Sequence, residues 1–179
     1  YPPIYPWLSA LVIALFGPKL EVLRYTTLFC EIAVLVLVYR ILRVEQLSRA
    51  NAWLVTSFLA GIYSVNKFHG LARVDFLVLV SVLGALHLLQ LELRRPSRVR
   101  FVALAMVVAV AGMTKPTAMV PLAGVGAFLL LQSLWSAEDR VQARRGGAAL
   151  ALGALLYGVC FVALNAATHG NFYRNTIEY

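Results

Sequence analysis

Residues 66–89 read NKFHGLARVDFLVLVSVLGALHLL. The first ten of these residues carry two cations, a histidine and a carboxylate, and a nearly unbroken apolar run follows from Phe76 to Leu89. A helix that crosses a bilayer needs about 20 apolar residues, whereas a soluble helix has a polar face as well as an apolar one. The stretch therefore predicts a membrane-spanning helix that begins at a polar cluster on the membrane surface.

The composition of the whole chain extends this interpretation. The 179 residues are 61% hydrophobic and 13% charged, and the mean hydropathy is +0.78. A backbone inside a bilayer must satisfy its own hydrogen bonds, and the period-two alternation of a membrane barrel is absent from the sequence. We therefore predict an all-α integral membrane protein, a polytopic helical bundle with about six transmembrane helices plus a short interfacial N-terminal helix.

The predicted organisation is a single transmembrane domain over residues 1–179. An outer-face interfacial segment covers residues 1–21, six spans lie within 22–167, and an outer-face tail covers 168–179. The apolar part of the first segment, Ile4–Phe16, is 13 residues long, which is too short to span a bilayer. The six predicted spans are Val22–Tyr39, Ala52–Val65, Val74–Leu91, Val99–Met113, Thr117–Trp135 and Gly147–Ala167.

The distribution of charge predicts the orientation of the chain. Ten of the 16 Lys and Arg residues follow the first, third and fifth spans: Arg40, Arg43, Arg49, Arg94, Arg95, Arg98, Arg100, Arg140, Arg144 and Arg145. Basic loops remain on the cytoplasmic side of a membrane protein, so the net charge of +8 indicates membrane topology rather than binding to nucleic acid. We expect a multi-pass protein of the inner (plasma) membrane, with the arginine-rich loops cytoplasmic and the active face extracytoplasmic.

Three basic residues on the predicted outer face are candidates for binding a phosphate. Lys115, Arg73 and Lys67 lie close to the outward N-termini of predicted spans. A helix N-terminus offers free N–H groups and a partial positive charge, which favour an anion. At a membrane boundary that anion is most simply a lipid phosphate. The alternative is that each side chain only extends along the helix end to reach water.

Four further residues are candidates for a supporting role. Asp75 could stabilise the first turn of its helix, or it could orient Arg73, bind a metal or act as a base. His69 and His169 are expected to form hydrogen bonds in outer loops, and Tyr1 suits the headgroup level. We predict no metal site within these residues.

Small and ionisable residues inside the spans suggest how the helices pack. Glu31 and His87 lie well within predicted spans, where a hydrogen bond between helices is the simpler role and a functional site the alternative. Close helix approach is expected at six glycines: Gly84, Gly124, Gly126, Gly147, Gly153 and Gly158.

Four short motifs resemble those of a known family. The Tyr1–Pro6 segment, YPPIYP, is followed by a short apolar helix; Ala72–Asp75 resembles an "aRxD" motif at the outer start of a helix; Gly112–Thr117 resembles an "llxKpt" junction; and His169–Phe172 resembles a small-residue and aromatic stretch. In this order they are similar to the GT-C superfamily membrane glycosyltransferases of the dolichyl-phosphate-mannose-protein mannosyltransferase type, including the bacterial RgtA/B/C/D-like domain.

The resemblance implies an inverting glycosyltransferase that takes a sugar from a polyprenyl-phosphate donor. The acceptor would be a lipid, a glycan or a protein at the extracytoplasmic face, and Lys115, Arg73 and Lys67 would hold the donor phosphate. The family's acidic base lies in a first outer loop, which we expect upstream of Tyr1, together with any divalent metal. No other cofactor is implied, and we expect these 179 residues alone to be inactive.

Two alternatives come from other functional classes. A transporter would place its binding groups near the midplane, where Glu31 and His87 lie. A non-catalytic membrane subunit would tolerate loss of Lys115 unless folding were harmed. The polar residues gather on the predicted outer face, which favours the transferase.

Overall fold

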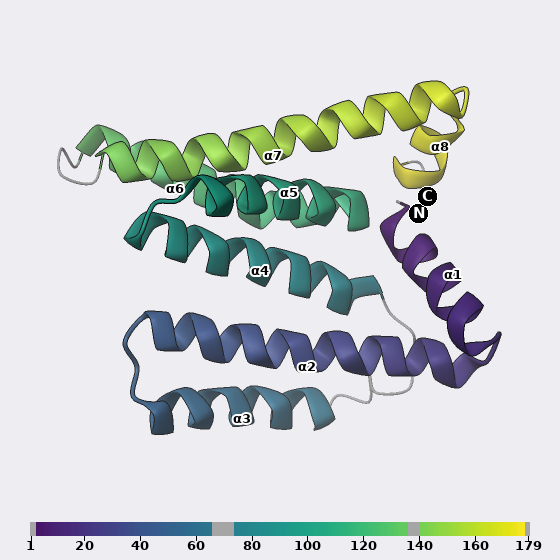
Figure 1. The fold of residues 1–179 in the computed structure, drawn as a ribbon, viewed down its shortest axis with the longest axis horizontal. Helices are drawn as coiled ribbons and strands as arrows, with labels where there is room; N and C mark the ends of the chain where they lie inside the picture. Colours follow the sequence, from purple (N-terminus) through teal and green to yellow (C-terminus); the bar gives the residue numbers. More distant parts are fainter. Residues whose placement is uncertain (1–2, 66–73, 136–139, 178–179) are drawn as a thin grey trace.

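The computed structural model describes residues 3–65, 74–135 and 140–177, and these residues form helices with no strand among them (Figure 1). The all-α prediction is therefore confirmed for the described part of the chain. The elements in chain order are α1 (Ile4–Phe16), α2 (Leu20–Val44), α3 (Arg49–Val65), α4 (Val74–Arg94), α5 (Arg98–Thr114), the short 3₁₀ turn η2 (Pro116–Ala118), α6 (Met119–Trp135), α7 (Arg140–Ala167) and α8 (Asn171–Ile177).

The helices cover the predicted apolar segments and extend beyond several of them; α2, for example, continues to Val44, five residues past the predicted end at Tyr39. Helix α7 begins at Arg140, seven residues before the predicted start at Gly147, because Ala143 and Gly146 already face inward and are buried. The predicted tail also contains a helix, α8, which begins after Gly170, a glycine with a φ of +83°.

Three segments of the described chain are long and apolar enough to cross a membrane, namely Asp75–Arg94, Pro116–Trp135 and Arg140–Ala167. The predicted number of about six is not confirmed. Helices α3 and α5 have 17 residues each, or about 26 Å at 1.5 Å per residue, which is less than the roughly 30 Å of a hydrocarbon core.

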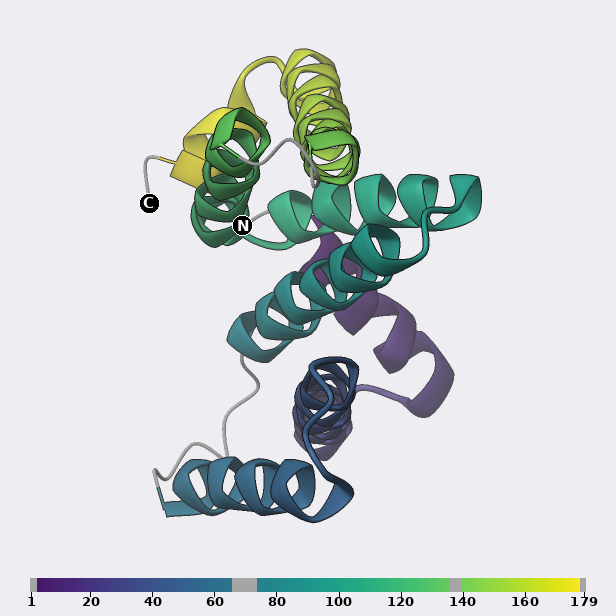
Figure 2. The same cartoon turned by 90° about the vertical axis from the view of Figure 1, so that its left-hand side faces the viewer.

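Helices α2, α4, α5 and α7 pack side by side, as Figure 1 shows, and α6 packs on α7. Helix α3 packs on the outer side of α2 and lies at one edge of the molecule, as the end-on view of Figure 2 shows. Helix α1 crosses one end of the row and contacts both α2 and α5.

The connections divide between the two ends of the bundle. The α2–α3 and α4–α5 connections and the start of α7 lie at the left-hand end in Figure 1, and this end carries the arginine-rich segments. The α5–α6 junction, the start of α4 and helix α8 lie at the opposite end. Lys115 and Asp75 are thus separated by the length of the bundle from most of the arginines.

The core is built where α4, α5, α6 and α7 meet, and glycines allow the closest contacts. A Cβ atom on Gly153 of α7 would lie 2.5 Å from Val108 Cβ and 2.7 Å from the Ala105 carbonyl oxygen of α5. The buried cluster includes Ala85, Leu89, Leu104, Val108, Ala111, Ala118, Leu122, Leu129, Ala143, Ala149 and Leu150.

Only one of the six predicted packing glycines is closely confined. Gly153 is confirmed, whereas Gly84 and Gly126 have ordinary contact distances, and Gly124, Gly147 and Gly158 have no neighbouring heavy atom within 4 Å that would meet a Cβ. Two glycines that the sequence analysis did not select are tight. A Cβ on Gly112 would meet the Tyr157 ring at 2.7 Å, and one on Gly146 would meet Leu89 Cδ1 at 2.9 Å.

Candidate functional site

Lys115 is the one residue between α5 and the 3₁₀ turn η2. Its backbone is extended, with φ −160° and ψ 127°. Pro116 explains this, because proline disfavours the helical conformation of the residue before it and suits the first position of the helical turn that it begins. The Lys115 N–H still donates to the Ala111 carbonyl at 3.1 Å, and its own carbonyl accepts from the Ala118 N–H at 2.9 Å. The backbone is therefore held on both sides of the break.

The Lys115 side chain reaches the first turn of α4. Its Nζ donates to Asp75 Oδ1 at 2.9 Å and forms an ion pair between residues 40 positions apart in the chain. The side chains are 41% and 52% exposed, respectively. A pair this open to solvent contributes at most about 1 kcal/mol to stability. Its main consequence is positional, because it fixes a cation at one end of the bundle where α4 begins and α5 ends.

The structure thus brings together two of the predicted site residues. The other predicted residues at this face lie outside the described residues: Arg73, Lys67 and His69 are in 66–73, and Tyr1 is in 1–2. His169 lies in the turn between α7 and α8, is exposed and has a φ of +52°.

The turn around His169 is organised by its neighbours rather than by the imidazole. Thr168 Oγ1 accepts a hydrogen bond from the Phe172 N–H at 3.0 Å, and Asn165 Oδ1 accepts one from the Tyr173 N–H at 2.9 Å. These bonds satisfy N–H groups in the first turn of α8, which have no partner within the helix. His169 therefore sits on a defined turn at the same end of the bundle as Lys115.

The described residues contain one unpartnered buried histidine nitrogen and no metal-binding cluster. His87, in the middle of α4, has a buried Nδ1 with no hydrogen-bond partner among the described residues. Among the described residues, no three His, Cys, Asp or Glu side chains lie where they could hold a metal ion together.

Glu92 is a buried charged residue that the sequence analysis missed. Its side chain is 1% exposed, and it lies at the arginine-rich end. Oε1 accepts from Arg145 Nε of α7 at 2.5 Å, and Oε2 accepts from the Ser97 N–H at 2.9 Å. Arg100 Nε is 3.8 Å from Oε2. One carboxylate therefore joins α4, the start of α5 and α7.

A sequence signal for Glu92 existed. Ser81, Ala85, Leu89 and Glu92 are all buried and are spaced by four, four and three residues, which places them on one face of α4. The predicted span ends at Leu91, one residue before Glu92, and therefore excludes it.

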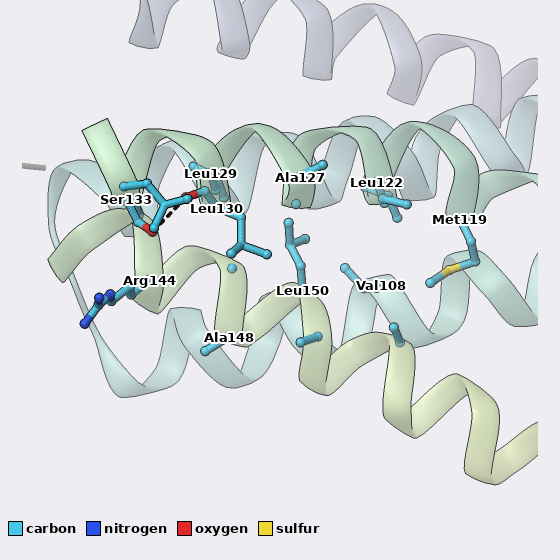
Figure 3. Close-up of a pocket in the computed structure, with 17 residues that line it drawn as sticks. Val108, Met119, Leu122, Ala127, Leu129, Leu130, Ser133, Arg144, Ala148 and Leu150 are labelled. Atoms are coloured by element: carbon cyan, nitrogen blue, oxygen red, sulfur yellow. Dashed lines mark hydrogen bonds between the residues drawn. The ribbon is translucent and has the colours of Figure 1, made fainter. Parts of the chain in front are cut away.

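An apolar groove of about 710 Å³ runs between α6 and α7, with Val108 of α5 at its floor. Figure 3 shows Met119 toward one end and Arg144 toward the other. Ser133 and Arg144 are the polar residues of its lining, and the Ser133 hydroxyl is bonded to the Leu130 carbonyl at 2.8 Å. A groove with this lining, within the span of two long apolar helices, is suited to hydrocarbon.

A protein-family model covers most of the chain. The family model described as dolichyl-phosphate-mannose-protein mannosyltransferase matches residues 1–163. No curated protein and no solved structure matches the chain.

Proposed function

Because this chain belongs to the dolichyl-phosphate-mannose-protein mannosyltransferase family of GT-C glycosyltransferases, we propose that it holds a polyprenyl-phosphate sugar donor through Lys115. The chain is a membrane protein of glycosyltransferase type. The proposal adds the donor, the face at which it is bound and the residue that binds it.

The observation that carries the proposal is the position of the Lys115 ammonium. It lies at the end of the bundle opposite the arginine-rich segments, and the positive-inside rule supports an extracytoplasmic location for that end. The Pro116 break presents its side chain at the start of η2 and α6, where helix N–H groups also favour an anion. The Asp75 carboxylate holds the ammonium in place before a phosphate arrives.

The chemistry that follows is a displacement at the sugar. An acceptor hydroxyl attacks C1 from the face opposite the phosphate, and the bond between C1 and the phosphate oxygen breaks. Polyprenyl phosphate leaves, and C1 of the sugar, now bonded to the acceptor oxygen, has the inverted configuration. Lys115 would stabilise the negative charge that grows on the leaving phosphate. The hydroxyl proton passes to a carboxylate base. Asp75 is already engaged by Lys115, so we assign the base to a different carboxylate.

The α6–α7 groove supports a lipid-linked donor. Its Met119 end is four residues beyond Lys115 in the chain, and its lining is almost wholly apolar. A prenyl chain lying in this groove would have its phosphate at the Lys115 end. Arg73 and Lys67, which precede Asp75, are proposed as the next phosphate contacts, with His69, His169 and Tyr1 in supporting positions.

The test is sugar transfer in membranes by the natural protein that contains these 179 residues, with a radiolabelled polyprenyl-phosphate sugar as donor. We expect Lys115→Ala to lower the transfer rate about 100-fold or more, as removal of one group that stabilises a developing oxyanion does. Lys19→Ala is the matched control, because Lys19 is an exposed lysine just before α2 at the same end. Equal rates for the two variants would refute the role of Lys115.

Transport is the second candidate, and it rests on the buried Nδ1 of His87, which has no hydrogen-bond partner in the described part of the chain. If the protein is a transporter, His87→Ala abolishes substrate movement and Lys115→Ala does not. If it is the proposed transferase, His87→Ala retains transfer while Lys115→Ala loses it.

A further inference from the structure

Four arginines line a pocket at the arginine-rich end, away from Lys115. The pocket has a volume of about 370 Å³ and lies between the end of α2, the end of α4 and the start of α5. Its lining consists of Arg43, Val44, Gln46, Leu91, Arg94, Arg95 and Arg100. Among the described residues, no acidic side chain contributes to this lining.

The neighbouring carboxylates neutralise only part of this charge. Glu45 contacts Arg94 at 3.3 Å and also accepts from Gln90 Nε2 at 2.7 Å. Glu92 is bonded to Arg145, and Arg100 Nε lies 3.8 Å away from it, beyond hydrogen-bond distance. The pocket therefore keeps an excess of positive charge.

The arginines also have unused hydrogen-bond donors. A guanidinium carries five N–H donors. Arg43 Nη1 donates to the Leu47 carbonyl, and Arg100 Nη2 donates to the Arg95 carbonyl. The buried Nε of Arg100 has no hydrogen-bond partner among the described residues. Within the same residues, the Arg95 side chain has no hydrogen bond or ion pair, since only its backbone carbonyl accepts a bond from Arg100. An anion entering the pocket would find several free donors.

We propose that this pocket binds the phosphate headgroup of an anionic phospholipid. Guanidinium groups bind phosphate oxygens through paired N–H donors, and basic pockets between membrane helices on the cytoplasmic side suit such headgroups. Val44 and Leu91 give the pocket an apolar part, which inorganic phosphate would not use but a lipid could. The site is separate from the proposed donor site and does not depend on sugar transfer.

The test measures lipid binding to the whole chain in a non-ionic detergent by native mass spectrometry. The probes are phosphatidylglycerol, phosphatidylcholine and inorganic phosphate. The pocket variant is Arg43→Gln/Arg95→Gln. The matched control is Arg49→Gln/Arg98→Gln, which removes the same charge from exposed positions at the same end, outside the pocket lining.

We expect the parent chain to bind phosphatidylglycerol in preference to phosphatidylcholine. The pocket variant should lose about 25-fold in affinity, or about fivefold for each arginine removed, and the control variant less than about twofold. Arg95→Gln alone should lose about fivefold. This single variant disturbs no hydrogen bond of the Arg95 side chain within the described residues, and it decides the question if the double variant does not fold.

Three results would overturn the proposal. Equal losses in the pocket and control variants would mean that the protein attracts the lipid by diffuse surface charge. Equal binding of phosphatidylcholine would mean that the headgroup charge is not recognised. Binding of inorganic phosphate as tightly as phosphatidylglycerol would identify a site for free phosphate rather than for a lipid.

Discussion

Gly153→Ala tests the packing of α5 against α7, on which the position of Lys115 depends. The added Cβ would lie 2.5 Å from Val108 Cβ and 2.7 Å from the Ala105 carbonyl oxygen. Carbon atoms pack at about 3.5–4.0 Å, so the two helices would have to separate by roughly 1 Å. Because the second contact is with backbone, rotation of a side chain cannot relieve it.

The cost follows from the contacts that separation would weaken. A gap of about 0.5–1 Å loses a quarter to a half of the dispersion energy of each contact. Val108 and Leu150 belong to the buried cluster that α5 and α7 share, so several contacts are affected at once. We expect the free energy of unfolding to fall by about 3 kcal/mol, the upper part of the range for overpacked cores.

The assay is equilibrium unfolding in mixed detergent micelles, followed by circular dichroism. Gly147→Ala, on the same helix, is the control, because a Cβ at Gly147 meets no heavy atom within 4 Å among the neighbours considered. It should be neutral or should stabilise the chain by up to about 1 kcal/mol through helix propensity. If Gly153→Ala is as stable as Gly147→Ala, the close approach of α5 and α7 is wrong.

Two further predictions concern the charged contacts. Glu92→Ala should lower the free energy of unfolding by about 3 kcal/mol, because it leaves Arg145 and the Ser97 N–H without their partner. Glu92→Gln, which keeps an acceptor, should lower it by about half as much. A loss below about 1 kcal/mol for Glu92→Ala in the same unfolding assay would contradict a stabilising role for these buried contacts. Asp75→Asn should change the free energy of unfolding by less than about 1 kcal/mol, because both side chains of the Lys115–Asp75 pair are about half exposed. A large drop in melting temperature would show that this pair stabilises the fold rather than positioning a cation for a ligand.

The helices could be predicted from the sequence because apolar runs and helix breakers are local signals. Pro116 fixed the end of α5, and Gly17-Pro18 separated α1 from α2. Helix α7 begins seven residues before the predicted span Gly147–Ala167, which starts at the first long apolar run. In the structure the inward face of α7 already begins at Ala143.

The contacts between distant residues could not be predicted from one sequence. Nothing local indicates that Lys115 reaches Asp75, 40 positions away, or that Arg145 reaches Glu92. The same limit applied to glycines, since Gly146 and Gly147 are adjacent but only Gly146 faces Leu89. Which of two neighbouring residues faces a partner depends on the rotation of the helix, and the packing of all the helices sets that rotation.

The position of α3 has a consequence for biosynthesis. Helix α3 lies against the outer side of α2, where Tyr39 and Trp53 have their ring centroids 5.1 Å apart, whereas α2 packs extensively on α4. The order of helices in space therefore differs from their order of synthesis. As the chain leaves the ribosome, α2 and α3 can pair first, but the face of α2 that receives α4 stays uncovered until residues 74–94 have been made. Translation paused between α3 and α4 would prolong exposure of that face to lipid and to membrane quality control.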